Sequence, residues 1–137
     1  MVVVLIGAML GVGLPYFRGA TEKTDVRGAM DAIAALHAMT KQTAVQRSRV
    51  TRLVMDRSNY TMVVVATKVS GTGVDTVGRV QNLNSRFGIR FTVSPALDTL
   101  TFTPRGIGVE AATTSIIVSK GSFSDTMAVS AAGRLIR

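Results

Sequence analysis

The only histidine of the chain, His37, is the one side chain of its type that could act as a general base near neutral pH. It lies on the apolar stripe of a predicted helix, where a structural histidine is far more common than a catalytic one. Asp31 and Ser48 lie at helical spacings that do not let them form a catalytic triad with His37. We therefore interpret His37 as structural and expect no catalytic residue and no enzymatic activity.

Metal and cofactor chemistry finds little support in the sequence. The chain has no cysteine and one histidine, which excludes disulfide scaffolds, thiolate metal sites and multi-histidine metal sites. Its eight acidic residues are scattered, without the alternating oxygen ligands of a calcium loop. Gly71, Gly73 and Gly78 match neither a dinucleotide-binding nor a phosphate-binding loop. We expect no metal and no cofactor.

Basic residues offer the clearest binding chemistry. Sixteen Lys and Arg against eight Asp and Glu give a net charge of +8, which favours anionic partners such as nucleic acid or phospholipid surfaces. Arg47, Arg49 and Arg52 cluster at a predicted helix-to-strand corner, whereas Arg134 and Arg137 end the chain. Arginines can bind DNA phosphates without reading the base sequence. These five are candidate DNA-binding residues, and a general use of arginine for solubility is the alternative.

Residues 1–20 are predicted to form a hydrophobic helix. The first seventeen positions carry no charge and would span roughly 26 Å as a helix, slightly less than the roughly 30 Å hydrocarbon core of a bilayer. A cleaved signal peptide is the alternative, but no basic residue precedes the apolar run and no good cleavage site follows it. We therefore predict a retained helix that lies in a membrane or in the core of a filament.

Five residues of this helix are candidates for packing and assembly. Gly7 and Gly11 form a pair of small residues that lets another helix approach closely in lipid. Pro15 is expected to kink the helix rather than end it. Val4 and Leu5 supply apolar surface in the same segment.

Residues 21–49 continue the helix in amphipathic form. Apolar and small residues recur at spacings of three and four, which indicates one face against an apolar surface: Val26, Met30, Ile33, His37, Thr40 and Ala44. Lys23, Arg27 and Lys41 suit the solvated face. A continuous helix from Met1 would be about 70 Å long, too long for the following residues to cover. Its first half must lie in a bilayer or among similar helices.

Residues 50–137 are predicted to form a small antiparallel β domain. Short segments rich in β-branched residues alternate with turn signals, which predicts strands at residues 50–55, 60–67, 87–93, 100–103, 115–119, 126–130 and 134–137. Residues 68–86 contain three glycines and two asparagines and are predicted to be a long loop. The expected fold class is α+β, with a long N-terminal helix, hydrophobic and then amphipathic, packed on the sheet.

The apolar start with Gly7 and Pro15 is followed by three characteristic segments. These are residues 38–53 (AMTKQTAVQRSRVTRL), residues 100–106 (LTFTPRG) and residues 131–137 (AAGRLIR). In this order, along a long helix and a small β domain, they resemble the type IV pilin-like proteins, and more specifically the GspH/FimT class of pseudopilins and minor pilins. The family begins its mature chain with a glutamate-containing segment after a basic leader, and neither is present here. We expect several residues of mature chain to precede Met1.

The resemblance implies a structural role. It implies a subunit of a type II secretion pseudopilus or a type IV pilus that assembles with other pilins through its N-terminal helix. It also implies an inner-membrane anchor, an extracytoplasmic β domain, processing by a prepilin peptidase and methylation of the mature start. A DNA-uptake pilin that binds DNA through Arg134 and Arg137 is the alternative, although their spacing is one residue longer than the family's pattern. A third alternative is an unrelated membrane-anchored periplasmic β domain.

Overall fold

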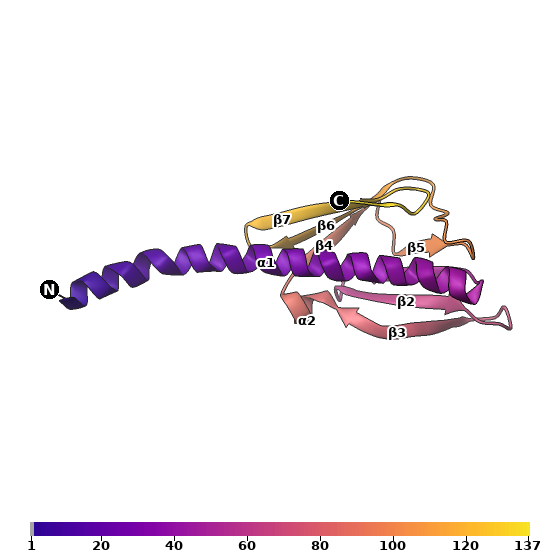
Figure 1. Cartoon of the computed structure of the whole chain (residues 1–137), viewed down its shortest axis with the longest axis horizontal. Coiled ribbons are helices and arrows are strands. Elements are labelled where there is room, and N and C mark those ends of the chain that lie inside the picture. Colours follow the sequence, from indigo (N-terminus) through magenta and orange to yellow (C-terminus); the bar gives the residue numbers. More distant parts are fainter. Residues whose placement is uncertain (1) are drawn as a thin grey trace.

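The long helix dominates the computed structural model, which describes residues 2–137 and gives side-chain surroundings from Phe17 onward. Helix α1 (Val2–Arg47) is continuous and about 69 Å long at 1.5 Å per residue. In Figure 1 its indigo N-terminal half extends alone beyond the β domain, and its C-terminal half lies along that domain. The α+β fold class predicted from the sequence is confirmed.

Eight strands and a short second helix follow α1. They are β1 (Thr51–Asp56), β2 (Thr61–Thr67), β3 (Val74–Asn82), α2 (Leu83–Phe87), β4 (Arg90–Ser94), β5 (Thr99–Phe102), β6 (Thr114–Lys120), β7 (Phe123–Val129) and β8 (Leu135–Ile136). All strands except β3 overlap strands that the sequence predicts. The expected hairpin turn after β1 is present, where Asp56 Oδ1 accepts hydrogen bonds from the backbone N–H groups of Ser58 and Asn59.

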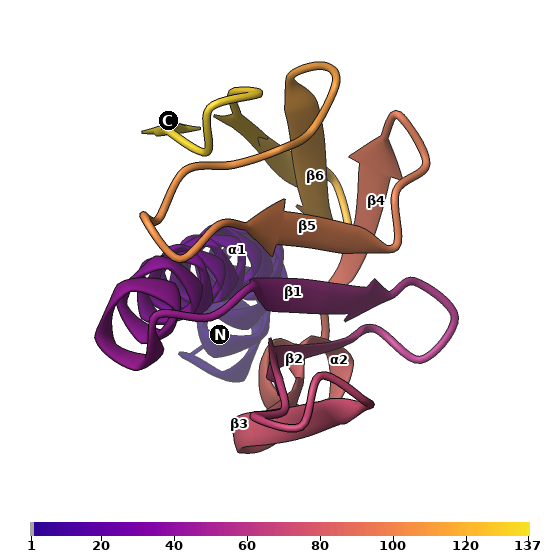
Figure 2. The same cartoon turned by 90° about the vertical axis from the view of Figure 1, so that its right-hand side faces the viewer.

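The strands form two four-stranded antiparallel sheets. Sheet A has the order β3-β2-β1-β5, and sheet B has the order β4-β6-β7-β8. Leu53 pairs with Val64 in sheet A, and Ile116 pairs with Met127 in sheet B. All four side chains are buried and belong to the same hydrophobic core as the buried residues of α1. Figure 2, seen along α1, shows both sheets wrapped around one side of the helix.

The predicted apolar stripe of α1 faces this core. Val26, Met30, Ile33 and Ala44 are fully buried, as the periodicity of three and four predicts. Thr40 is buried as well, and its hydroxyl donates to Leu36 O at 2.7 Å, so the polar group has a partner inside the helix. Burial of each large apolar side chain contributes roughly 1.5–3 kcal/mol, so the second half of α1 is held mainly by hydrophobic packing.

The prediction of a long loop over residues 68–86 is wrong. Strand β3 (Val74–Asn82) lies within this segment and pairs with β2, with a bulge opposite the Met62 to Val64 segment. Gly78 lies in the bulge with φ +80°, a conformation that glycine adopts without strain. Asn82 caps α2, since its side chain accepts a hydrogen bond from Ser85 N. Glycine and asparagine here shape a bulge and a helix cap, and the following strand begins at Arg90 rather than residue 87.

Candidate functional site

The N-terminal half of α1 is the first candidate surface. From Phe17 onward, the first residue of α1 in the hydrophobic core is Val26, and Figure 1 shows the preceding helix running away from the β domain. Residues 2–21, which precede the contact of Glu22 with Ser122, form a protruding rod of about 30 Å. The predicted assembly residues all fall within this rod, ahead of the part of the chain whose side chains are described: Val4, Leu5, Gly7, Gly11 and Pro15.

Membrane insertion of the rod stays a prediction from the sequence. Among the residues that the structure describes, no helix combines enough length with enough apolar character to cross a bilayer. The apolar run that motivates the prediction lies almost wholly in residues 1–16, whose side chains are not among those described.

The neck, where the rod leaves the domain, is fastened by charged groups. Lys120 Nζ, at the end of β6, donates to Asp25 Oδ2 and, at 3.0 Å, to Phe87 O. In the turn after β6, Ser122 donates from its backbone N–H and its hydroxyl to Glu22 Oε2, both at 3.3 Å. The end of β6 and the turn after it are thus bound to a single turn of α1, and Lys120 also connects them to α2.

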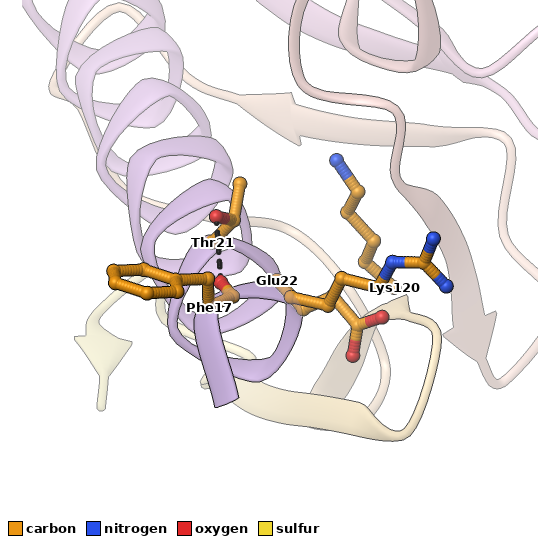
Figure 3. A pocket seen from close by; sticks show the side chains of 5 residues that line it. Phe17, Thr21, Glu22 and Lys120 are labelled. Carbon is orange, nitrogen blue, oxygen red and sulfur yellow. Dashed lines mark hydrogen bonds between the residues drawn. The ribbon is translucent and has the colours of Figure 1, made fainter. Parts of the chain in front are cut away.

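An open pocket lies at this neck. It has a volume of about 320 Å³ and is lined by Phe17, Arg18, Thr21, Glu22 and Lys120. Figure 3 shows the Thr21 hydroxyl donating to Phe17 O, at 2.9 Å, with the ring of Phe17 turned outward from the helix. Phe17 is 71% exposed. The pocket combines an apolar ring with charges of both signs.

A second, more polar pocket adjoins the neck. It has a volume of about 430 Å³, and its lining includes Arg90, Ser119, Lys120 and Gly121. Arg90 is exposed at the start of β4 and lies opposite Ser119 in the sheet register. Lys120 therefore lines both pockets, at the end of the domain nearest the rod.

A buried, uncharged junction fastens the other part of α1. His37 is 5% exposed, and its Nε2 lies 3.1 Å from Gly133 O. Because a carbonyl oxygen only accepts, Nε2 carries the proton and donates. The imidazole also meets the ring of Phe102 edge-to-face, with centroids 5.4 Å apart and planes at 78°. His37 thus joins α1 to Phe102 of sheet A and to the turn before β8, as a structural residue.

Electrostatics at this junction favour the neutral imidazole. Burial lowers the pKa of His37, and the positive charge of Lys41 one turn along the helix lowers the pKa further. The hydrogen bond to Gly133 O acts in the opposite direction and is the smaller influence. His37 is therefore uncharged at neutral pH.

The five predicted DNA-binding arginines do not form one cluster. Arg137 Nη1 lies 2.7 Å from Asp31 Oδ1. Asp31 is sixteen residues before Arg47, or about 24 Å along the axis of α1. Arg49 donates from Nη1 to Thr67 O at a long 3.5 Å. The structure therefore separates the corner group (Arg47, Arg49, Arg52) from the terminal pair (Arg134, Arg137).

The sequence did not single out the residues of the neck. Glu22 and Asp25 contact Ser122 and Lys120, respectively, so 100 and 95 residues separate the partners along the chain. No local spacing reveals such pairs. Gly121 is the one residue here whose type reflects the contact. Its φ is +56°, and an added Cβ would overlap the carboxylate of Glu22, but this requirement is visible only in the structure.

Comparison with known proteins gives a consistent result. The family described as "Type II transport protein GspH" matches residues 29–133. The type IV minor pilin FimU of Pseudomonas aeruginosa has a TM-score of 0.66 and 18% identity, over 83% of this chain and 88% of that one. The minor pseudopilin EpsH from the Type 2 Secretion System of Vibrio cholerae has a TM-score of 0.64 and 10% identity, over 82% and 94%. No curated protein matches the chain in sequence. At these identities the structures establish the fold alone.

Proposed function

Because the chain belongs to the GspH family of type II transport proteins, we propose that it is a minor pseudopilin or minor pilin that assembles through its N-terminal helix. Membership confirms the resemblance inferred from the sequence, and it makes the alternative of an unrelated membrane-anchored β domain wrong. Proteins of this family are structural subunits of a pilus or pseudopilus and not enzymes, and pilins assemble with one another into filaments.

The protruding rod is the observation that carries the proposal. The rod is about 30 Å long, and its sequence carries no charge up to Phe17. Lipid tails and neighbouring helices offer such a surface similar apolar surroundings, so transfer between them changes the hydrophobic free energy little. The helix first anchors the subunit in the inner membrane, with the β domain on the extracytoplasmic side, and then enters the filament core. Other pilins and, for a longer precursor, a prepilin peptidase are the partners.

Charge substitution in the rod tests this mechanism. Val4→Asp or Leu5→Asp places a carboxylate in the apolar segment, at a cost of roughly 3 kcal/mol near the centre of a membrane helix. Pull-down of co-expressed pilins is expected to lose the variant subunit. Val69→Asp is the matched control, because Val69 is exposed in a loop and the same change there leaves assembly intact. Assembly of the Val4 and Leu5 variants at the control's level contradicts the proposal.

DNA binding is the second candidate function. Its support is that Arg134 is exposed on a turn. Two hydrogen bonds fix this turn: one from His37 Nε2 to Gly133 O, and one from Arg134 N to Ser130 Oγ. A gel shift with residues 21–137 tests it. Binding at low salt that is lost in the Arg134→Ala, Arg137→Ala double variant supports DNA capture. Arg57→Ala is the control, since Arg57 pairs with Asp98 on another part of the surface. Absence of a shift at low salt removes this candidate.

A further inference from the structure

Positive charge is concentrated where the rod meets the β domain. We define the neck surface as residues 17–25 of α1, residues 84–90 and the turn at residues 119–123. It contains five basic residues, Arg18, Lys23, Arg86, Arg90 and Lys120, against the acidic residues Glu22 and Asp25, which gives a net charge of +3. Both acids already have partners, Ser122 and Lys120.

Four of the five cations are available to a ligand. Lys120 is engaged with Asp25, whereas none of the others forms an ion pair within residues 17–137. Arg90 lines the polar pocket beside Ser119, and Arg18 lines the adjoining pocket beside Phe17. A guanidinium presents several N–H donors that match phosphate oxygens, so these two arginines supply the chemistry of a phosphate site.

Three of the five phenylalanines also gather at the neck surface. Phe17 is exposed, and Phe87 and Phe123 are half-buried. The guanidinium of Arg86 lies 4.9 Å from the centroid of the Phe87 ring, and Lys23 Nζ lies 5.9 Å from that of Phe123. Aromatic rings beside lysine and arginine are typical of segments that lie at a membrane interface.

We propose that the neck surface binds the phosphate headgroups of anionic phospholipids, with Arg18 and Arg90 as the main ligands. The inference rests on the proposed membrane anchoring of the rod, because the apolar run ends at Phe17 and so places the neck at the bilayer surface. Before assembly, the domain therefore rests on the membrane with its neck surface against the headgroups.

Vesicle binding by a fragment without the apolar run tests the proposal. Residues 18–137 retain Arg18 and every core residue of the part of the chain whose burial is described, from Val26 to Val129, so we expect the fragment to fold on its own. It is expected to sediment with vesicles of phosphatidylethanolamine and phosphatidylglycerol and not with vesicles of phosphatidylcholine. Arg18→Gln and Arg90→Gln should each weaken binding about five-fold, because a basic residue near an anionic surface contributes about 1 kcal/mol.

Arg105→Gln is the matched control, since Arg105 is exposed in the turn after β5, beside Gly106, which lies near Val45 at the far end of α1, and its substitution removes the same charge. Three results overturn the proposal: no preference for anionic vesicles, equal weakening by Arg105→Gln, or full competition by inorganic phosphate at millimolar levels. The fragment is also tested with duplex DNA. If it binds DNA, and if Arg90→Gln weakens this binding as strongly as it weakens vesicle binding, the neck surface is a nucleic-acid site instead. Failure here leaves the assembly function intact, because the Val4 and Leu5 variants test that function separately.

Discussion

In addition to the hydrophobic core, two sets of specific contacts fasten the β domain to α1, and they use opposite chemistry. At the His37 junction the contacts are buried and neutral: a backbone carbonyl, an aromatic ring and two glycines in close approach. At the neck they are charged and partly exposed, through Lys120 with Asp25 and Ser122 with Glu22. Buried contacts depend on fit, whereas exposed ion pairs are weakened by salt and by competing water. We therefore expect the junction to contribute more to stability than the neck does.

Gly133→Ala should have the largest effect, because it breaks the buried junction. Gly133 has φ +82°, and an added Cβ would lie 2.6 Å from Phe102 Cε1 and 2.9 Å from Gly108 N. Backbone strain and overpacking together are expected to cost about 3 kcal/mol in the free energy of unfolding. Chemical denaturation measures this loss. Gly71→Ala is the control, since Gly71 has φ +76° with nothing near its Cβ position, and only strain remains. Equal losses in the two variants contradict the close-packed junction.

Acid should weaken the junction through His37. Its pKa is lowered in the folded protein by burial and by Lys41, so the unfolded chain takes up the proton first as the pH falls. Stability is therefore full above about pH 6.5 and declines below it by up to about 1.4 kcal/mol per pH unit until the folded pKa is reached. Denaturation between neutral pH and pH 5 measures the slope. The His37→Gln variant has an amide that can donate to Gly133 O but cannot take up a proton, so the decline of stability between neutral pH and pH 5 should become smaller. An unchanged decline would show that other groups cause the pH dependence.

Lys120→Met should have the smallest effect. It removes the ion pair with Asp25 and the hydrogen bond to Phe87 O but keeps the aliphatic stem, so we expect a loss of about 1 kcal/mol. High salt should shrink the difference between the variant and the parent protein. Thermal denaturation at low and high salt measures both. If Lys120→Met lowers the free energy of unfolding as much as Gly133→Ala does, the neck contributes as much to stability as the junction, and the proposed difference between them is wrong.

The sequence predicts contacts that repeat along one element better than contacts between distant elements. The stripe from Val26 to Ala44 has helical periodicity, so its burial follows from the residues alone. Strand β3 is not predicted because the glycines and asparagines of residues 68–86 are typical of loops. In the structure, Gly78 instead permits a bulge within a strand that pairs with β2. The neck was missed because its partners lie about a hundred residues apart. The DNA-binding arginines were grouped by type, and only the fold separates them.

The two fastenings also determine how a pull on the rod reaches the β domain. Glu22 and His37 are fifteen residues apart, or about 22 Å along a continuous helix. A sideways force at the N-terminal end of the rod therefore acts against two separate sets of contacts, and both must break before the helix can tilt relative to the β domain. Rotation of the rod about its axis should likewise rotate the β domain with it, so the orientation of the rod determines the orientation of the domain.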